Sequence, residues 1–238
     1  MSRTERARFT LDALRERTPE PETELAYTNP FELLVAVVLS AQCTDARVNK
    51  VTPALFEAFP DAQALAEATP DDVFPFIRSV SYPNNKAKHL AGLGAMLVDE
   101  FGGEVPQTIP ELIKLPGVGR KTALVVTSVA FGADAVAVDT HVFRVSNRIG
   151  LVPPSADTPL KVERSLGRVI PRDEWSEAHH LLILHGRYTC LARAPKCEVC
   201  PVTAVCDYFA RLQTLPAPIP DLDPKRGRYF APTGGYFD

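Results

Sequence analysis

The stretch Leu115-Pro-Gly-Val-Gly-Arg-Lys-Thr-Ala-Leu124 places a Gly-x-Gly turn directly before an apolar segment with helical spacing. Glycine lets the backbone approach a ligand closely, and the amide groups of residues 117–119 would point at an anion from the start of the helix. Such a turn holds a phosphate backbone without distinguishing the bases. The stretch therefore predicts a turn and helix that bind the phosphate of a nucleic acid.

The same stretch allows two other interpretations. Arg120-Lys121-Thr122 looks like the end of a Walker A loop, but that loop needs glycine where Arg120 and Leu115 stand. An ordinary helix start is the default for a lone Gly-x-Gly turn, and this alternative stays open.

Lys121 and Asp139 are predicted to face each other. Lys121 lies in the first helical turn, where the helix dipole disfavours a positive charge. If it is also partly buried, it gives up its proton more readily and becomes a usable nucleophile. The helix rises roughly 17 Å before Gly132 ends it, and an extended return of roughly 20 Å brings Asp139 level with Lys121. Alternatively, Asp139 only caps a helix over residues 140–149.

Four cysteines near the C-terminus, with the spacing C-x6-C-x2-C-x5-C, predict a shared ligand site. They are Cys190, Cys197, Cys200 and Cys206. Soft thiolates select zinc or an iron–sulfur cluster, and the long, unequal gaps favour a [4Fe–4S] cluster over a zinc knuckle. A structural zinc site and a pair of disulfides are the alternatives. Cys43 stands apart and is expected to be a small, buried, inert thiol.

Helical spacing dominates the rest of the chain. Helices are expected near residues 30–39 (with Asn29 as cap), 44–59, 90–98, 160–170 and 175–184. Only residues 136–138 resemble a strand. Proline and glycine accumulate after Leu215, which predicts a tail without a core of its own.

Composition limits the class of protein. The 238 residues are 45% hydrophobic and carry a formal net charge of −3, a weak argument against nucleic acid as partner that clustered basic residues can offset. No apolar stretch is long enough to span a membrane, and the charged N-terminus does not look like a signal peptide. A reducing cytoplasm is expected, where clustered cysteines usually bind metal.

Four segments together carry a family resemblance. They are Leu39-Ser-Ala-Gln-Cys-Thr-Asp, Leu115-Pro-Gly-Val-Gly-Arg-Lys-Thr-Ala, Val138-Asp-Thr-His-Val-Phe-Arg-Val-Ser-Asn-Arg and His185-Gly-Arg-Tyr-Thr-Cys, followed by the cysteine quartet. From about residue 25 to residue 210 the chain resembles the endonuclease III family, the DNA glycosylases and AP lyases of the helix–hairpin–helix superfamily.

The resemblance implies an all-α fold of two helical domains with a DNA-binding cleft between them. A six-helix domain with the helix–hairpin–helix motif is expected over residues 23–133, and an iron–sulfur cluster domain over 1–22 plus 134–211. Residues 212–238 remain as the Pro/Gly-rich tail.

The resemblance also assigns an activity. It implies base excision repair of oxidised pyrimidines, with strand cleavage by β-elimination through a Schiff base on Lys121. Asp139 is the implied catalytic carboxylate, and the four cysteines are the implied ligands of [4Fe–4S]. The adenine-mismatch glycosylases share fold and cluster but lack this lysine. The alternative from another class is a DNA-structure-binding protein with weakened catalysis.

Further residues are expected to contact DNA. They are Gln42, which would fill the space left in the duplex, and Tyr82, Lys86, Gly117, Gly119, Arg120, His141, Arg144, Arg193 and Lys196. Ser81-Tyr-Pro-Asn-Asn-Lys-Ala departs from the family at the loop that would wedge into the opposite strand. Pro83 is expected to hold Tyr82 extended, with the ring either stacking on a base or packing inward.

The expected partner is double-stranded DNA with oxidised pyrimidines or abasic sites. The protein is expected to act as a monomer in the cytoplasm, at the nucleoid.

Overall fold

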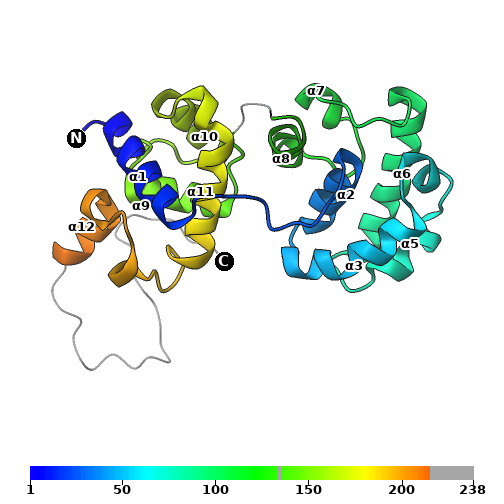
Figure 1. Ribbon diagram of the computed structural model, residues 1–238, viewed down its shortest axis with the longest axis horizontal. Coiled ribbons are helices and arrows are strands. Elements are labelled where there is room, and N and C mark those ends of the chain that lie inside the picture. The colour runs from blue at the N-terminus through cyan, green and yellow to red at the C-terminus, as the bar shows by residue number, and fades with distance from the viewer. Residues whose placement is uncertain (133–135, 215–238) are drawn as a thin grey trace.

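The computed structural model describes residues 1–132 and 136–214, and throughout these ranges the secondary structure is helical, without a β-strand (Figure 1). The all-α prediction is therefore confirmed, and residues 136–138 are irregular rather than extended into a sheet. None of the described helices has the length and apolar character needed to cross a membrane.

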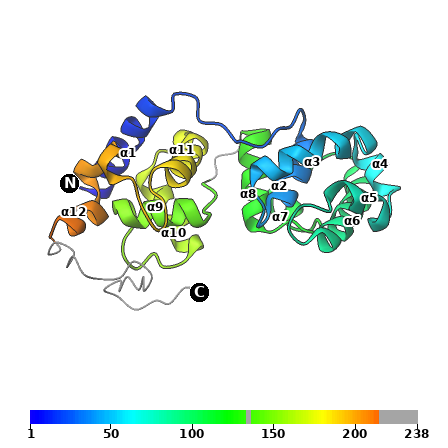
Figure 2. The ribbon, with the colours of Figure 1, turned by 90° about the horizontal axis from the view of Figure 1, so that it is seen from below.

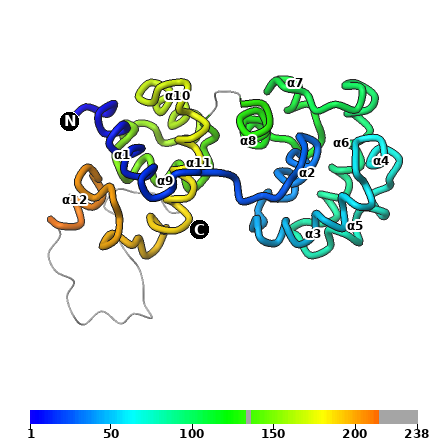
Figure 3. Tube along the Cα trace, viewed as in Figure 1, coloured from blue at the N-terminus to red at the C-terminus, as the bar shows by residue number. Residues whose placement is uncertain are grey.

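Two lobes lie side by side (Figures 1 and 2). The hairpin lobe, residues 25–132, contains α2 (Pro30–Ser40), α3 (Asp45–Ala58), α4 (Ala62–Ala66), α5 (Pro70–Ile77), α6 (Pro83–Phe101), α7 (Ile109–Leu112) and α8 (Arg120–Phe131). The cysteine lobe, residues 1–17 plus 136–214, contains α1 (Arg3–Arg17), α9 (Thr140–Ile149), α10 (Pro159–Val169), α11 (Trp175–Tyr188) and α12 (Asp207–Thr214). The segment between α1 and α2 runs from one lobe to the other (Figure 3).

Each lobe has its own apolar core. The α2 helix is buried along nearly its whole length and forms the centre of the first core, with α6 and α8 packed against it. The second core joins the N-terminal α1 to α9, α10 and α11. The two cores support the expected pair of domains, whose boundaries stay a prediction.

Local signals set most helix ends. Asn29 accepts a hydrogen bond from the amide of Glu32 at 2.9 Å and so caps α2, with Pro30 in the first turn. Gly102 and Gly132, both left-handed, end α6 and α8. These features confirm the predictions for Asn29 and Gly132.

The expected start of the tail at residue 212 stays a prediction, although residues 212–214 are helical. The α12 helix continues through residues 212–214, because no proline interrupts it until Pro216. Residues 215–238 lie outside the described residues, and so does the prediction for them.

Candidate active site

The predicted glycine turn joins α7 to α8. Leu115 and Val118 are buried in the core and anchor the turn, and the Val118 amide donates to the Leu115 carbonyl at 3.1 Å. Gly117 has a φ of 78°, and a Cβ added there would lie 3.0 Å from Cβ of His89. Gly119 begins α8 without a side-chain cap from any described residue, and the space beside its Cα is open. The first amides of α8 therefore face an open surface where an anion can bind.

Lys121 and Asp139 meet beside this turn. The Lys121 ammonium nitrogen lies 3.8 Å from Oδ2 of Asp139. The other carboxylate oxygen of Asp139 accepts hydrogen bonds from the amides of His141 and Val142, both at 2.8 Å, and so caps α9. The predicted approach and the alternative capping role are thus both present. The side chain of Lys121 is 58% exposed, so the expectation that burial activates it has no support.

A cavity between the two lobes contains this pair. Its walls come from the end of α2, from α8, from α11 and from the connecting segment at residues 22–25. His179 and Arg187 of α11 line it with Lys121 and Asp139. Burial lowers the pKa of His179 to about 3, so its imidazole is neutral near neutral pH. The cavity thus places an amine, a carboxylate and a neutral histidine together.

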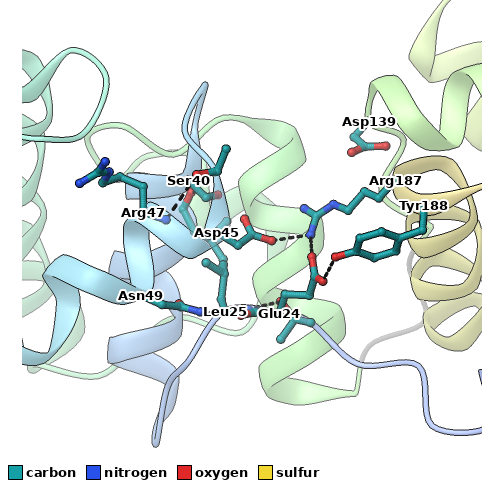
Figure 4. Close-up of polar contacts among 12 residues, drawn as sticks. Glu24, Leu25, Ser40, Asp45, Arg47, Asn49, Asp139, Arg187 and Tyr188 are labelled. Carbon is teal, nitrogen blue, oxygen red and sulfur yellow. Dashed lines mark hydrogen bonds and ion pairs between the residues drawn. The ribbon is translucent and has the colours of Figure 1, made fainter. Parts of the chain in front are cut away.

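Arg187, which lines the cavity, joins the two lobes (Figure 4). Its guanidinium donates to Asp45 Oδ2, at 2.6 Å, and to Glu24, which also accepts from the Tyr188 hydroxyl. Asp45 begins α3 in the hairpin lobe, whereas Arg187 belongs to α11 in the cysteine lobe. Figure 4 shows Asp139 beside this ion-pair cluster. Glu24 and Asp45 lie more than 140 positions from Arg187, so no local signal in the sequence indicates their contact with it.

Gln42 and Tyr82 are exposed and lie in neighbouring turns. Gln42 has a φ of 54°, and its carbonyl accepts a hydrogen bond from the Ser81 hydroxyl at 2.6 Å. Tyr82 is 62% exposed, so the alternative in which its ring packs inward is excluded. The expected extended geometry of Tyr82 is wrong, since its φ and ψ are 55° and 50°. The tight turn into α6 requires this left-handed conformation despite Pro83.

Lys86 is not placed for the expected contact with DNA. Its side chain is 5% exposed and its ammonium donates to the carbonyls of Leu39 and Ala41, at 2.8 and 2.7 Å. Burial lowers the pKa of Lys86. In this structure the Lys86 ammonium stabilises the C-terminal end of α2 and does not lie at the molecular surface.

Three other expected DNA contacts have partners inside the protein. Arg144 donates to the carbonyls of Cys190 and Gly186, at 3.1 and 2.9 Å, and lies 3.2 Å from Nδ1 of the half-buried His141. Burial lowers the pKa of Arg144. Arg120 forms an exposed ion pair with Glu163 at 2.7 Å, an arrangement that a phosphate could displace. Arg144 thus joins α9 to the cysteine loop, and Arg120 remains accessible.

The four predicted ligand cysteines line one small cavity in the cysteine lobe. Burial raises the pKa of the Cys197, Cys200 and Cys206 thiols, and the neighbouring cysteines raise each of them further. Among the described residues, no three His, Cys, Asp or Glu side chains form a group that could hold a single metal ion. Cys43 lies elsewhere and is half-buried rather than fully buried.

Two basic features surround the cysteine cavity. The Arg148 guanidinium donates to the carbonyls of Leu191 and Ala192, at 2.6 and 2.8 Å, and lies 3.6 Å from Sγ of Cys190. Arg193 and Lys196, on the loop between the first two cysteines, are exposed. The loop is therefore attached to α9 on one side and presents positive charge on the other.

Comparison with known proteins identifies this arrangement. Residues 35–172 match the model of the HhH-GPD superfamily base excision DNA repair proteins. Endonuclease III of Bacillus subtilis (strain 168) is 48% identical over 198 residues, which cover 83% of this chain and 90% of that protein. The chain belongs to the endonuclease III family. Endonuclease III of Escherichia coli (strain K12) is 44% identical over 198 residues, covering 83% of this chain and 93% of that protein.

Solved structures of the endonuclease III family agree with this membership. A trapped endonuclease III–DNA covalent intermediate, an estranged-adenine complex, has a TM-score of 0.84 at 47% identity and covers 90% of this chain and 100% of its own. A non-covalent endonuclease III–DNA complex has the same TM-score and identity, covering 90% of this chain and 99% of its own. The present chain is therefore a DNA-binding enzyme of base excision repair, a DNA glycosylase and AP lyase of the endonuclease III family.

Proposed function

We propose that this endonuclease III family member removes oxidised pyrimidines from duplex DNA and then cleaves the abasic strand, with Lys121 as nucleophile and Asp139 as catalytic carboxylate. One observation carries the assignment: the amine lies 3.8 Å from a carboxylate oxygen, beside a helix start whose amides face an open surface. A phosphate held by those amides would bring the sugar of an extruded nucleotide to the amine.

The reaction follows from these roles. Lys121, neutral at the moment of attack, forms a bond to C1′ of the extruded nucleotide while the bond to the base breaks and the base leaves with the electron pair. Asp139 offsets the positive charge that develops on the sugar or takes the proton released by the amine. The C1′–O4′ bond then breaks, O4′ takes up a proton, and the opened sugar is left as an imine of Lys121. This imine makes the C2′ proton acidic, and removal of that proton breaks the C3′–O bond and expels the 3′ phosphate by β-elimination.

Asp139 suits this role because its two oxygens are used differently. Oδ1 is engaged by two backbone amides, which fixes the side chain, and Oδ2 faces Lys121. The side chain of Asp139 is only 8% exposed and is therefore held in place, whereas Lys121 is 58% exposed and free to approach the sugar.

The proposed DNA contacts are those that remain on the surface. Gly117 and Gly119 would bind phosphate through their amides, and Arg193 and Lys196 would bind it through their exposed charges. Gln42 and Tyr82 would enter the duplex around the extruded nucleotide, with the Tyr82 ring stacking on a base. Direct contact is proposed for Arg120 and His141, and an indirect contribution through the cysteine loop for Arg144.

The cysteine quartet is proposed to bind a [4Fe–4S] cluster. The residues fit such a group, because four thiols line one cavity and the Arg148 guanidinium and the Phe209 amide donate toward two of the sulfurs, at 3.6 and 3.5 Å. When bound, the cluster would supply a structural clamp. Arg148 and Arg144 would then orient the loop that carries Arg193 and Lys196.

Elemental analysis of the purified protein tests the cluster. We expect iron and sulfide, and one zinc without iron would refute the proposal. Cys200→Ser should release iron and weaken DNA binding, whereas Cys43→Ala should leave the iron content unchanged, because Cys43 lies in the other lobe.

Covalent trapping tests the catalytic assignment. Wild-type protein incubated with a thymine-glycol duplex in the presence of borohydride should become linked to the DNA, because borohydride reduces the imine. Lys121→Gln should bind the duplex but form no link, since the amides of the glycine turn do not depend on the lysine. Binding without trapping by the wild type would favour the alternative, a DNA-structure-binding protein with weakened catalysis.

We also propose a monomer that acts in the cytoplasm at the nucleoid. The closure of both cores within one chain supports the monomer. Sedimentation of the protein alone and with DNA tests it.

A further inference from the structure

Gln42 and Tyr82 share an unusual backbone conformation. Within residues 1–132 and 136–214, they are the two non-glycine residues with a positive φ, at 54° and 55°. A side chain in this region crowds the following carbonyl, and such residues persist only where the surroundings hold them. Tyr82 also precedes Pro83, which disfavours helical conformations for the residue before it. The two residues proposed to enter the duplex are therefore the two strained ones.

The end of α2 shows what holds Gln42. The α6, α8 and α9 helices are each followed by a left-handed glycine, whereas α2 is followed by Ala41 and then by Gln42. The last carbonyls of a helix have no partner within it. Here the Lys86 ammonium donates to the carbonyls of Leu39 and Ala41. A buried lysine therefore stabilises a helix end at which the chain has no glycine.

The same lysine belongs to the second turn. Lys86 lies in the first turn of α6, and its amide donates to the Tyr82 carbonyl at 3.1 Å. The Ser81 hydroxyl, beside Tyr82, donates to the Gln42 carbonyl. Lys86 is thus bonded to both turns, and Ser81 forms a second connection between them.

We infer that Lys86 is a positioning residue that holds Gln42 and Tyr82 as one unit for entry into the duplex. The inference rests on the proposed function of those two residues. Lys86 does not touch DNA or the reacting atoms in this role. Its ammonium holds the carbonyls of Leu39 and Ala41 in place. Because Gln42 follows Ala41 directly, this also fixes the position of the Gln42 side chain relative to the Tyr82 ring.

Lys86→Met tests this, because methionine keeps most of the buried volume and loses the three N–H donors. Lys88→Met is the matched control, since Lys88 is an exposed lysine two residues further along α6. Each protein is added to a duplex with 2-aminopurine opposite an abasic-site analogue, and the fluorescence increase at saturation reports how far the opposite base is unstacked. We expect a clearly smaller increase for Lys86→Met and a wild-type increase for Lys88→Met.

Affinity and trapping separate positioning from a merely structural role. Lys86→Met should bind the lesion duplex more weakly, by a factor on the order of ten, yet trap single-stranded abasic DNA like the wild type. In a Gln42→Ala background, Lys86→Met should reduce duplex affinity much less than it does in the wild type, because the side chain that Lys86 positions is no longer present. The inference would be overturned if Lys86→Met lost duplex binding and single-strand trapping to the same extent, and if that loss equalled the decrease in its folded fraction.

A second variant decides the matter if Lys86→Met does not fold. Ser81→Ala removes the surface connection between the turns and should reduce the fluorescence increase in the same direction. The inference is overturned if a folded Lys86→Met gives the same fluorescence increase as the wild-type protein. If Lys86→Met does not fold, the same result for Ser81→Ala overturns it. It is also overturned if the wild-type protein leaves 2-aminopurine stacked. These binding signals need no catalysis, so failure of the proposed chemistry appears separately, as the absence of borohydride trapping by the wild type.

Discussion

At the scale of single residues, Asp139 combines two roles that the sequence presented as alternatives. A helix cap uses one carboxylate oxygen, and the amides of His141 and Val142 engage Oδ1 only. The remaining oxygen is directed at Lys121. The capping hydrogen bonds thus also support the proposed catalytic role. They fix the Asp139 carboxylate at the start of α9, and the core of the cysteine lobe determines the position of that helix.

Asp139→Asn should separate these roles. Asparagine caps helices about as well as aspartate, so the free energy of unfolding should change by less than about 1 kcal/mol. Base removal should slow by a factor on the order of 10² to 10⁴, because the amide is neutral and takes no proton. Urea unfolding and single-turnover kinetics on a thymine-glycol duplex measure the two effects. A normal rate would mean that Asp139 is only a cap.

His179 should make stability depend on pH. Its pKa is about 3 in the folded protein because of burial, against 6.5 for an exposed histidine. Between these values the unfolded chain binds a proton that the folded protein does not, so stability is complete above about pH 6.5 and falls as the pH decreases. One such group contributes up to about 1.4 kcal/mol per pH unit.

His179→Gln should therefore flatten the loss of stability between pH 6.5 and 4.5. Urea unfolding of the variant and the wild type over that range compares the slopes directly. Since the other titrating groups are the same in both proteins, equal slopes would show that His179 does not titrate in this way.

At the scale of elements, the two glycines of the turn between α7 and α8 differ in purpose. Gly117 needs its positive φ and has His89 against it, whereas Gly119 has extended backbone and open space at the start of α8. The first glycine therefore serves folding, and the second leaves room for a ligand.

Gly117→Ala and Gly119→Ala should accordingly fail in different ways. Gly117→Ala should cost about 1–2 kcal/mol of stability, the cost of a left-handed alanine. Gly119→Ala should keep its melting temperature and bind undamaged duplex more weakly, because its methyl group would occupy the phosphate position. Calorimetry and fluorescence anisotropy measure these effects. Normal binding by a folded Gly119→Ala would remove the α8 amides from the proposed DNA interface.

At the scale of the whole molecule, an ion-pair cluster connects the lobes beside the cavity (Figure 4). Arg187 of α11 pairs with Glu24 of the connecting segment and with Asp45, whose side chain is 13% exposed. Because the lobes have separate cores, this cluster and the contacts around it set how closely Lys121, on one lobe, approaches Asp139, on the other.

Arg187→Met should loosen this approach. It leaves the Asp45 carboxylate largely buried without its cation, which should cost about 1–3 kcal/mol. The radius of gyration from small-angle X-ray scattering should increase, and the rate of trapping on abasic DNA should fall. Lys161→Met is the control, since it breaks only the exposed pair with Asp157 and should change neither quantity. An unchanged radius with normal trapping would show that Arg187 does not hold the lobes together.

The sequence by itself determined the elements and several residues of the site. Caps such as Asn29, terminators such as Gly132 and the glycine turn at 117–119 are local signals, readable because their partners lie within a few positions. The length of α8 even predicted that Asp139 would return to Lys121. The capping box between Ser2 and Glu5 is an equally local signal for the start of α1. It was not predicted, because the many charged residues of this segment leave only a weak apolar pattern.

Only the tertiary structure decided what the basic residues do. Lys86, Arg144 and Arg187 are basic residues of the kind that bind DNA. In the structure, however, each donates to a group of a distant segment of the same chain. Tyr82 is left-handed against its local preference before Pro83, and the hydroxyl of the neighbouring Ser81 donates to the distant Gln42 carbonyl. The physical reason is the same for the three basic residues: burial and long-range hydrogen bonds outweigh local propensity, and neither is written in the spacing of neighbouring residues.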